Sequence, residues 1–292
     1  MNIILKKIIK TFVPKPVIDR FRAKAIYSAT KEYNIIVSPE PKLKGKTALV
    51  TGGNGAIGRA ICFKLAAEGA KVYVSGRNEQ KVQSVVDEIR SKGLAAESMI
   101  MDISSAEDIE NAFNKTFENE KLDILINCAG GGSREKANSI DKISVDVIDD
   151  IINSNLRGTI LCTRKAMQNM IANGTKGKIV IISSAVGIGG MKNYGEYAAA
   201  KAGDLGFMKS VALEAGQYGI NVNCVSPGKV PRGDLTEFEI EYTKNTNPLK
   251  SLCTMEDVAN AVFFMVTDDA KFITGQNLCV DGGRTLGLYG DN

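Results

Sequence analysis

The chain has 292 residues, of which 44% are apolar, and its 37 basic and 33 acidic residues give a net charge of +4. This balance is typical of a globular protein and does not suggest a nucleic-acid partner. The sequence contains no His, which excludes Ser-His-Asp triads, Cys-His pairs and His-ligated zinc sites. Proton transfer must therefore use Tyr, Lys, Ser, carboxylates or a cofactor, and we expect no metal site.

The six cysteines form no C-x-x-C pair and lie within apolar runs such as ILINCAG. We interpret them as buried thiols in a reducing compartment, which favours a cytoplasmic location over a disulfide-bonded secreted protein. No apolar run approaches the roughly 20 residues that a membrane-spanning helix needs.

The N-terminal part of the chain is basic. Residues 1–46 hold 11 basic and 3 acidic residues, a net charge of +8, which leaves −4 for the remainder. Pro39 and Pro41 mark the boundary between the two parts. We therefore predict a basic amphipathic extension over residues 1–44 and a single globular domain over residues 45–292.

Apolar residues recur at helical spacing within this extension, with lysines between them, and the first apolar run is too short for a signal peptide. Three interpretations stay open. The segment forms a helix packed on the rest of the chain or on a sister subunit, an amphipathic helix on an anionic membrane surface, or a disordered basic tail. The second would place residues 1–24 at the periphery of the inner face of a membrane.

From Gly45 onward, short β-branched runs alternate with helical patterns. The sequence predicts strands over residues 46–51, 71–75, 97–102, 122–127, 178–184, 220–226 and 276–283. The predicted helices end near residue 68 and span about 78–91, 105–118, 144–172, 195–216 and 254–267. This alternation indicates an α/β fold of the Rossmann type, a doubly wound, seven-stranded parallel sheet with helices on both faces. Ligands bind such sheets at the C-terminal ends of the strands.

The end of the first strand is rich in glycine and leads into a helix. Gly53, Gly55 and Gly58 follow the GxGxxG spacing, which lets the backbone approach a pyrophosphate at the helix N-terminus. The alternative is a glycine-rich turn without a ligand.

A second pair of residues suggests acid–base chemistry. Tyr197 and Lys201 are four residues apart on a predicted helix, so both side chains lie on one face. A phenol is a poor base at neutral pH, but a neighbouring cation lowers the pKa of such a group. Ser184 ends a predicted strand 13 residues before Tyr197 and could donate a hydrogen bond to a carbonyl oxygen. A chance Tyr–Lys spacing is the alternative.

Nine motifs occur in one order along residues 45–292, and together they resemble the short-chain dehydrogenase/reductase family. The resemblance is to the compact branch that includes 3-oxoacyl-acyl-carrier-protein reductases and sugar or polyol dehydrogenases. The motifs are TGGNGAIG, MDIS, NCAG, NSNLRG, IISSAVG, YAAAK, SPG, EDVANAV and ITGQNLCVDGG.

The resemblance implies a catalytic set of four residues. Tyr197 would be the general acid/base, Lys201 would lower the pKa of the phenol and hold the nicotinamide ribose, and Ser184 would polarise the substrate carbonyl. Asn155 would hold a water molecule in a proton relay through Lys201. The reaction would transfer a hydride between the nicotinamide and a carbonyl or secondary alcohol of a small molecule.

The resemblance also implies a set of cofactor-binding residues. Asp102 would bind the adenine amino group, and Val230 would bind the carboxamide through its backbone. Tyr197 and Lys201 belong to this set as well. Its other members are Gly52, Asn54, Gly55, Ala56, Ile57, Gly58, Arg77, Ile103, Asn127, Ala129, Gly130, Pro227 and Gly228.

The end of the second strand bears on the choice of cofactor. NAD-binding proteins usually place an acid there to bind the ribose diol. Here Gly76 occupies that place and Arg77 follows, and Arg suits a 2′-phosphate. We therefore favour NADPH/NADP+ over NAD, with a solvated Arg77 in a loop as the alternative.

Three features depart from the family pattern. Ala56 fills a position where the branch has Gly, Arg232 stands where a Thr is common, and the lid segment over about 232–250 is short. Three loop residues suggest an anionic or highly polar substrate, namely Arg134, Lys192 and Arg232. Against a uniformly basic pocket stand three lid residues, namely Glu237, Glu239 and Glu241.

Two classes of function follow. The first is an NADP(H)-dependent reductase or dehydrogenase acting on 3-oxoacyl groups or on sugars and polyols. The second is a dinucleotide-binding scaffold or regulatory protein with little turnover. The resemblance also implies a homodimer or homotetramer that pairs the helices over about 144–172 and 195–216.

Overall fold

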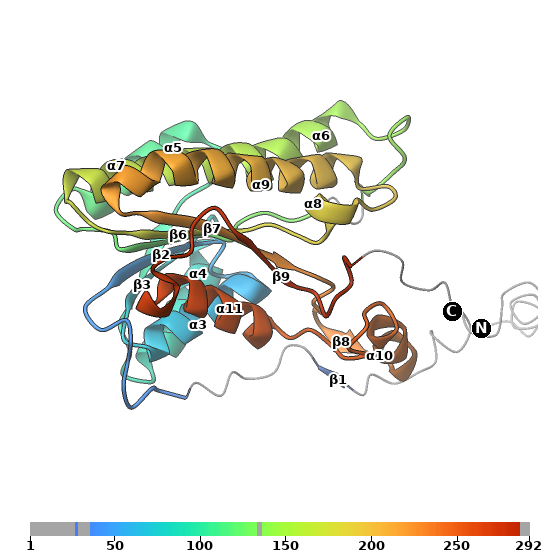
Figure 1. Cartoon of the computed structure of the whole chain (residues 1–292), viewed down its shortest axis with the longest axis horizontal. Coiled ribbons are helices and arrows are strands. Elements are labelled where there is room, and N and C mark those ends of the chain that lie inside the picture. Colours follow the sequence, from blue (N-terminus) through green and yellow to red (C-terminus); the bar gives the residue numbers. More distant parts are fainter. Residues whose placement is uncertain (1–26, 29–35, 133–135, 287–292) are drawn as a thin grey trace, which may run out of the picture.

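The computed structural model describes residues 27–28, 36–132 and 136–286. Seven strands form one parallel sheet in the order β4-β3-β2-β5-β6-β7-β9, which confirms the predicted doubly wound fold (Figure 1). The strands are β2 (Thr47–Thr51), β3 (Lys71–Gly76), β4 (Ala96–Ile100), β5 (Ile124–Asn127), β6 (Lys178–Ile182), β7 (Asn221–Pro227) and β9 (Asn277–Val280).

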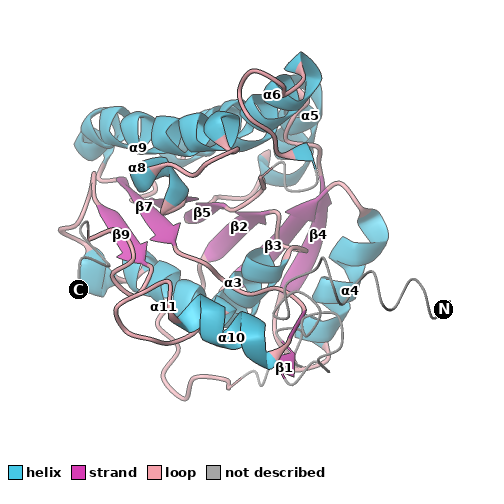
Figure 2. Ribbon diagram, turned by 90° about the vertical axis from the view of Figure 1, so that its right-hand side faces the viewer, coloured by secondary structure: helices cyan, strands magenta, loops and turns pink. Residues whose placement is uncertain are grey.

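Helices cover both faces of this sheet, as Figures 1 and 2 show. One layer holds α3 (Ala56–Ala67), α4 (Glu79–Arg90) and α11 (Met255–Val266). The other layer holds α5 (Ala106–Phe117), α7 (Gly158–Ala172) and α9 (Gly195–Ala215).

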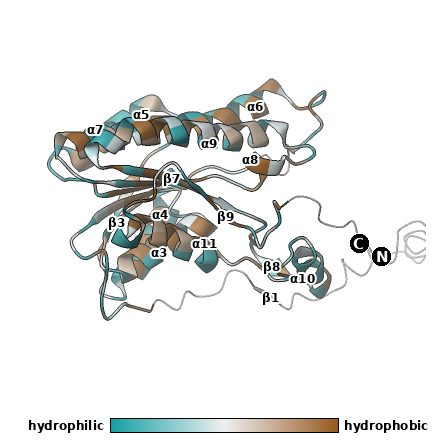
Figure 3. Cartoon of the chain, viewed as in Figure 1, coloured by the Kyte–Doolittle hydropathy of each residue, from teal (hydrophilic) through white to brown (hydrophobic). Residues whose placement is uncertain are grey.

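Each strand of the sheet centre contributes to two cores. In β2, Ala48 and Val50 pack against the first helix layer, whereas Leu49 packs against the second. Successive strand residues point to opposite faces, so a strand covered on both sides must be apolar throughout. Figure 3 shows hydrophobic strands between helices that carry both hydrophobic and hydrophilic residues.

The helix predicted over residues 144–172 contains a change of geometry. It runs as α6 (Val145–Ile152), the π-helical turn η2 (Asn153–Arg157) and then α7. Such π turns are common at functional sites. The turn includes Asn155, one of the predicted catalytic residues.

Several short elements were not predicted. They include α8 (Val186–Gly189) and, within the lid, β8 (Asp234–Leu235) and α10 (Glu237–Lys244). Thr236 and Glu239 form a capping box at the start of α10, which explains how a short acidic segment becomes helical. A strand of the extension, β1 (Tyr27–Ser28), pairs antiparallel with β8.

The predicted boundary at residue 44 and the helical extension stay predictions, because residues 1–26 and 29–35 lie outside the described residues. Within the described part of the chain, no helix combines the length and the apolar character needed to cross a membrane.

The sheet changes its direction of winding between β2 and β5. From β2 the chain proceeds outward to β3 and β4, and from β5 it proceeds the other way to β6, β7 and β9. The Thr51 hydroxyl accepts hydrogen bonds from the backbone N–H groups of Cys128 and Ala129, both at 3.1 Å. It therefore joins the two strand ends at the point where such folds bind ligands.

Candidate active site

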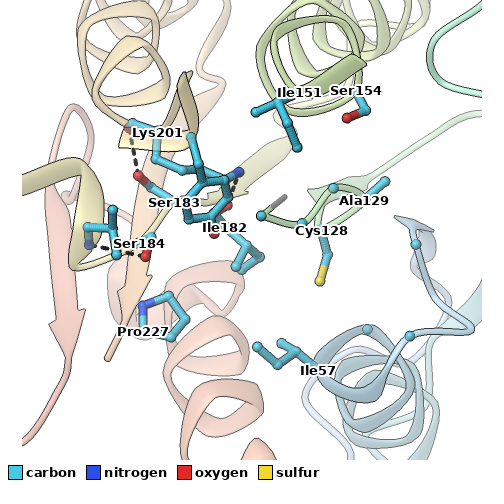
Figure 4. Close-up of a pocket in the computed structure, with 18 of the residues that line it drawn as sticks. Ile57, Cys128, Ala129, Ile151, Ser154, Ile182, Ser183, Ser184, Lys201 and Pro227 are labelled. Atoms are coloured by element: carbon cyan, nitrogen blue, oxygen red, sulfur yellow. Dashed lines mark hydrogen bonds between the residues drawn. The ribbon is translucent and has the colours of Figure 1, made fainter. Parts of the chain in front are cut away.

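A cavity of about 1550 Å³ lies at the C-terminal ends of the strands. Its walls come from segments far apart in the sequence, including the β2–α3 turn, the loops after β5 and β6, and the start of α9 (Figure 4). Most predicted cofactor-binding residues line it, namely Gly52, Asn54, Gly55, Ala56, Ile57, Gly58, Arg77, Asp102, Ile103, Ala129, Gly130, Tyr197, Lys201, Pro227, Gly228 and Val230.

The turn between β2 and α3 has the geometry of a phosphate cradle. A Cβ atom on Gly58 would lie 2.1 Å from the Gly52 carbonyl oxygen, so this position excludes every side chain. Gly55 begins α3 without a side-chain cap, which leaves a helix N-terminus facing the cavity. The turn therefore fits the pyrophosphate of a dinucleotide despite the Ala at position 56.

The end of β3 supplies positive charge to one end of the cavity. A Cβ atom on Gly76 would lie 2.3 Å from Asn54 Oδ1, so the Asn54 side chain occupies the space that an acidic residue at 76 would need. Arg77 and Lys81 are exposed and line the cavity. Lys81 was not predicted from the sequence, although it lies only four residues after Arg77, in the first turn of α4.

Asp102 also lines the cavity and carries a negative charge. Hydrogen bonds from the backbone and hydroxyl of Ser104 lower the pKa of this carboxyl, and Arg77 adds a smaller effect. The aspartate is thus held as an acceptor beside the loop after β4.

Ser184, Tyr197 and Lys201 all line the same cavity, which brings together three residues from the β6 loop and α9. Ser184 is nearly buried, and its hydroxyl accepts a hydrogen bond from the Val186 N–H at 3.1 Å. The hydroxyl proton therefore stays available for another acceptor. Figure 4 shows Ser184 and Lys201 on one side of the cavity, with Cys128 and Ala129 across from them.

Lys201 is fixed by two acceptors. The residue is only 4% exposed. Its ammonium donates hydrogen bonds to the Ile182 carbonyl and to the Asp204 carboxylate, both at 2.9 Å. Burial lowers the pKa of this ammonium, but Asp204 and Tyr197 together outweigh the effect and raise it. Lys201 is therefore a permanent cation in the wall of the cavity.

The structure places Asn155 and Asn127 behind the cavity rather than in its lining. Asn155 is fully buried, and its amide bonds both the N–H and the carbonyl of Gly131. Asn127 is 3% exposed and donates to the Thr163 hydroxyl. Asn155 therefore shapes the loop after β5, whereas Asn127 links the end of β5 to α7.

The far side of the cavity contains residues that were not predicted to bind anything. Lys229, Arg284 and Thr285 line it together with Arg232. Asp281 positions the last segment, because its carboxylate accepts from the N–H of Gly283 and from the N–H and hydroxyl of Thr285. The only sequence signal was the polar DGGRT segment directly after the last strand.

The other charged residues singled out from the sequence are placed differently. Lys192 is exposed and does not line the cavity, and residue 134 lies outside the described residues. Three glutamates of α10 also stay out of the cavity lining, namely Glu237, Glu239 and Glu241.

Cys128 lines the cavity near Lys201, but its chemistry is that of a neutral thiol. Burial raises the pKa of Cys128 to about 11, against the opposing effects of Lys201 and Arg232. A thiol with this pKa is not a nucleophile at neutral pH.

Comparison with known proteins agrees with this geometry. The sequence matches the family described as enoyl-(acyl carrier protein) reductase over residues 53–285. It is 35% identical to BbsD of Thauera aromatica, a hydroxy(phenyl)methylsuccinyl-CoA dehydrogenase subunit, over 84% of this chain and 98% of that protein. It is 37% identical to the 3-oxoacyl-(acyl-carrier-protein) reductase FabG of Rickettsia conorii, with the same coverage.

Solved structures give the same result. A structure described as a gluconate dehydrogenase from Agrobacterium tumefaciens has a TM-score of 0.79 and 29% identity, covering 86% of this chain and 100% of that one. A gluconate 5-dehydrogenase from Burkholderia cenocepacia, in complex with NADP and tartrate, has a TM-score of 0.78 and 25% identity, covering 85% and 98%. This chain therefore belongs to the short-chain dehydrogenase/reductase family and is an oxidoreductase that uses a nicotinamide dinucleotide to interconvert C=O and CH–OH groups.

Proposed function

We propose that the protein is an NADP(H)-dependent carbonyl reductase or secondary-alcohol dehydrogenase in which Tyr197 is the general acid/base. One observation carries this proposal. Ser184, Tyr197 and Lys201 line the same cavity as the glycine turn of residues 52–58. The three candidate catalytic side chains and the turn that fits a dinucleotide pyrophosphate therefore face the same cavity.

Ser184, Tyr197 and Lys201 have different roles in the proposed reaction. The bound nicotinamide supplies or accepts the hydride. Ser184 donates a hydrogen bond to the substrate oxygen and so stabilises the negative charge that develops there. Tyr197 gives that oxygen a proton during reduction and removes it during oxidation. Lys201 keeps a positive charge beside the phenol, which stabilises the negative charge that develops on the phenol oxygen during proton transfer.

The choice of NADP(H) rests on the end of β3. Asn54 fills the space that an acid at position 76 would occupy, and Arg77 and Lys81 line the cavity beside it. Two cations with no acid at position 76 match a ribose 2′-phosphate better than a free diol.

The substrate class follows from the opposite side of the cavity. Lys229, Arg232 and Arg284 line it, and such a cluster favours an anionic substrate. Two chemical types meet this condition, an acyl group carried on a phosphate-containing thioester and an oxidised sugar or sugar acid. The described relatives include both kinds of enzyme.

The test measures NADPH oxidation at 340 nm with acetoacetyl thioesters, keto-sugar acids, neutral ketoses and small diketones. We expect turnover with an anionic member of the panel and none with Tyr197→Phe. A Tyr194→Phe variant is the matched control, because Tyr194 lines the same cavity on the preceding turn. Tight cofactor binding without turnover on any member would instead favour the scaffold interpretation.

We also propose a homo-oligomer built on the α7–α9 layer. This layer carries exposed apolar side chains, among them Ile160 and Ile171 on α7 and Leu213 on α9. Leu213 is 85% exposed, and burial of these side chains between two subunits would stabilise the assembly.

A further inference from the structure

A carboxylate that this mechanism does not use lies directly behind Lys201. Asp204 follows it by three residues on α9 and is completely buried. Its Oδ2 accepts a hydrogen bond from the Lys201 ammonium at 2.9 Å. Its Oδ1 has no hydrogen-bond partner within the described part of the chain. An aspartate in such a position is costly, and the fold explains neither its charge nor its unsatisfied oxygen.

The backbone around this pair is fixed to the sheet. The Ser183 hydroxyl, directly after β6, donates to the Lys201 carbonyl at 2.8 Å. The Cys224 thiol of β7 donates to the Asp204 carbonyl at 3.8 Å. The ammonium and the carboxylate therefore have little freedom to move apart.

The arrangement directs the ammonium toward the cavity. An ammonium has three N–H donors, and Lys201 uses one on Ile182 and one on Asp204. The third is available to the cavity, whose lining includes both Lys201 and Tyr197. Asp204 thus acts on the phenol in two ways, through the position of the cation and through its own opposing charge.

The other groups around the pair do not replace this carboxylate. Cys224 of β7 and Cys128 after β5 are neutral thiols, because burial raises the pKa of each. Arg157 of η2 donates to the carbonyl of Ser104. The acidic residues of α6 are exposed, and α8 has no ionisable side chain. Arg232, which also lines the cavity, opposes the rise in the pKa of Cys128.

We propose that Asp204 is a positioning residue that fixes Lys201 and offsets part of its charge, and so sets the pH range in which Tyr197 exchanges its proton. This inference rests on the proposed role of Tyr197. Burial raises the pKa of Asp204 to about 6 even though Lys201 opposes the shift. At neutral pH the carboxylate is therefore charged and the pair is close to neutral.

The direction of the effect follows from electrostatics. Removing a negative charge beside the cluster makes every remaining group easier to deprotonate. Lys201 keeps its proton through the Ile182 carbonyl and the developing phenolate, so the proton is lost from the phenol. We expect the ionisation of Tyr197 to move about one pH unit toward acid in Asp204→Asn.

The experiment titrates tyrosinate absorbance at 295 nm in the full-length protein. Each protein is compared with the same protein carrying Tyr197→Phe. The difference between the two titrations is the signal of Tyr197 alone among the eight tyrosines. Asp204→Asn removes the charge and keeps a hydrogen-bond acceptor. Asp204→Val removes both, and its apolar side chain suits the buried site if the Asn variant does not fold. The matched control is Asp123→Asn, since Asp123 is 4% exposed and pairs with Lys46 and the Thr47 N–H at the opposite end of the sheet.

An acid shift in both Asp204 variants, with none in Asp123→Asn, would support the inference. The pH profile of alcohol oxidation should then move in the same direction in Asp204→Asn. A folded Asp204 variant that titrates like the wild type, or toward base, would overturn it. Turnover that survives Tyr197→Phe would overturn the proposed function instead, and the titration would still decide the role of Asp204 because it needs no turnover.

Discussion

Asn155 holds the backbone of Gly131 from both sides. Its Oδ1 accepts from the Gly131 N–H at 2.9 Å, and its Nδ2 donates to the Gly131 carbonyl at 3.1 Å and to the Ile151 carbonyl at 2.9 Å. A Cβ atom on Gly130 would lie 2.4 Å from the same amide oxygen. The amide thus determines the path of the loop after β5, which forms one wall of the cavity.

Asn155→Ala should therefore impair both stability and catalysis. The loss of three buried hydrogen bonds should lower the free energy of unfolding by about 2–3 kcal/mol. A displaced wall should reduce kcat/KM about tenfold or more. Urea unfolding and steady-state kinetics measure the two effects.

Asn169→Ala is the matched control for this prediction. The Asn169 amide bonds the N–H of Leu122 and the carbonyls of Phe117 and Glu120, and none of these residues lines the cavity. Its loss should reduce stability to a similar degree and leave kcat/KM unchanged. Equal kinetic effects of the two variants would contradict the role assigned to Asn155.

Arg77→Ala should change the preference for cofactor. If the guanidinium binds a 2′-phosphate, its removal should reduce kcat/KM with NADPH about 10- to 100-fold and leave the value with NADH nearly unchanged. Lys92→Ala is the control, because Lys92 is an exposed cation in the next loop and does not line the cavity. Wild-type protein that prefers NADH would remove the basis of this prediction.

The seven parallel strands, their alternation with helices and most of the glycine turn could be predicted from local pattern. Buried parallel strands are apolar along most of their length, and the fully buried β2, with its sequence TALVT, has a polar residue only at each end. The role of Asn155 could not be predicted, because it depends on a π turn and on a loop 24 residues away. Asp204 and Arg284 were missed for a related reason. Their significance comes from side chains and cavity walls that meet only after folding.

Gly58→Ala should abolish tight cofactor binding, since its Cβ atom would collide with the Gly52 carbonyl. We expect the dissociation constant for NADPH to rise at least about tenfold, as measured by fluorescence titration. Gly206→Ala is the control, because a Cβ atom there meets nothing within 4 Å. This exposed position within α9 should gain about 0.5–1 kcal/mol of stability and keep its affinity.

Leu213→Glu should weaken assembly. A charge at this highly exposed position of α9 would oppose burial in a subunit interface. Light scattering after size-exclusion chromatography should show a smaller species than the wild type at equal concentration. Leu249→Glu makes the same change at an exposed lid residue and should leave the mass unchanged. A monomeric wild-type protein would exclude the proposed interface.

The charge of Asp204 should also appear in the pH dependence of stability. Burial raises the pKa of this carboxyl to about 6 in the folded protein, whereas an unfolded Asp titrates near 3.9. The folded state thus binds the proton more tightly than the unfolded state. The contribution of Asp204 to the free energy of unfolding is therefore fully present below about pH 4. It is lost as the pH rises through 6, by at most about 3 kcal/mol.

Asp204→Asn cannot titrate and should lack this component. Urea unfolding of both proteins between pH 4 and 7 measures it. The free energy of unfolding of the wild type should fall relative to that of the variant across that range. Parallel curves would show that Asp204 is already ionised at pH 4, and that the ammonium of Lys201 compensates fully for its burial.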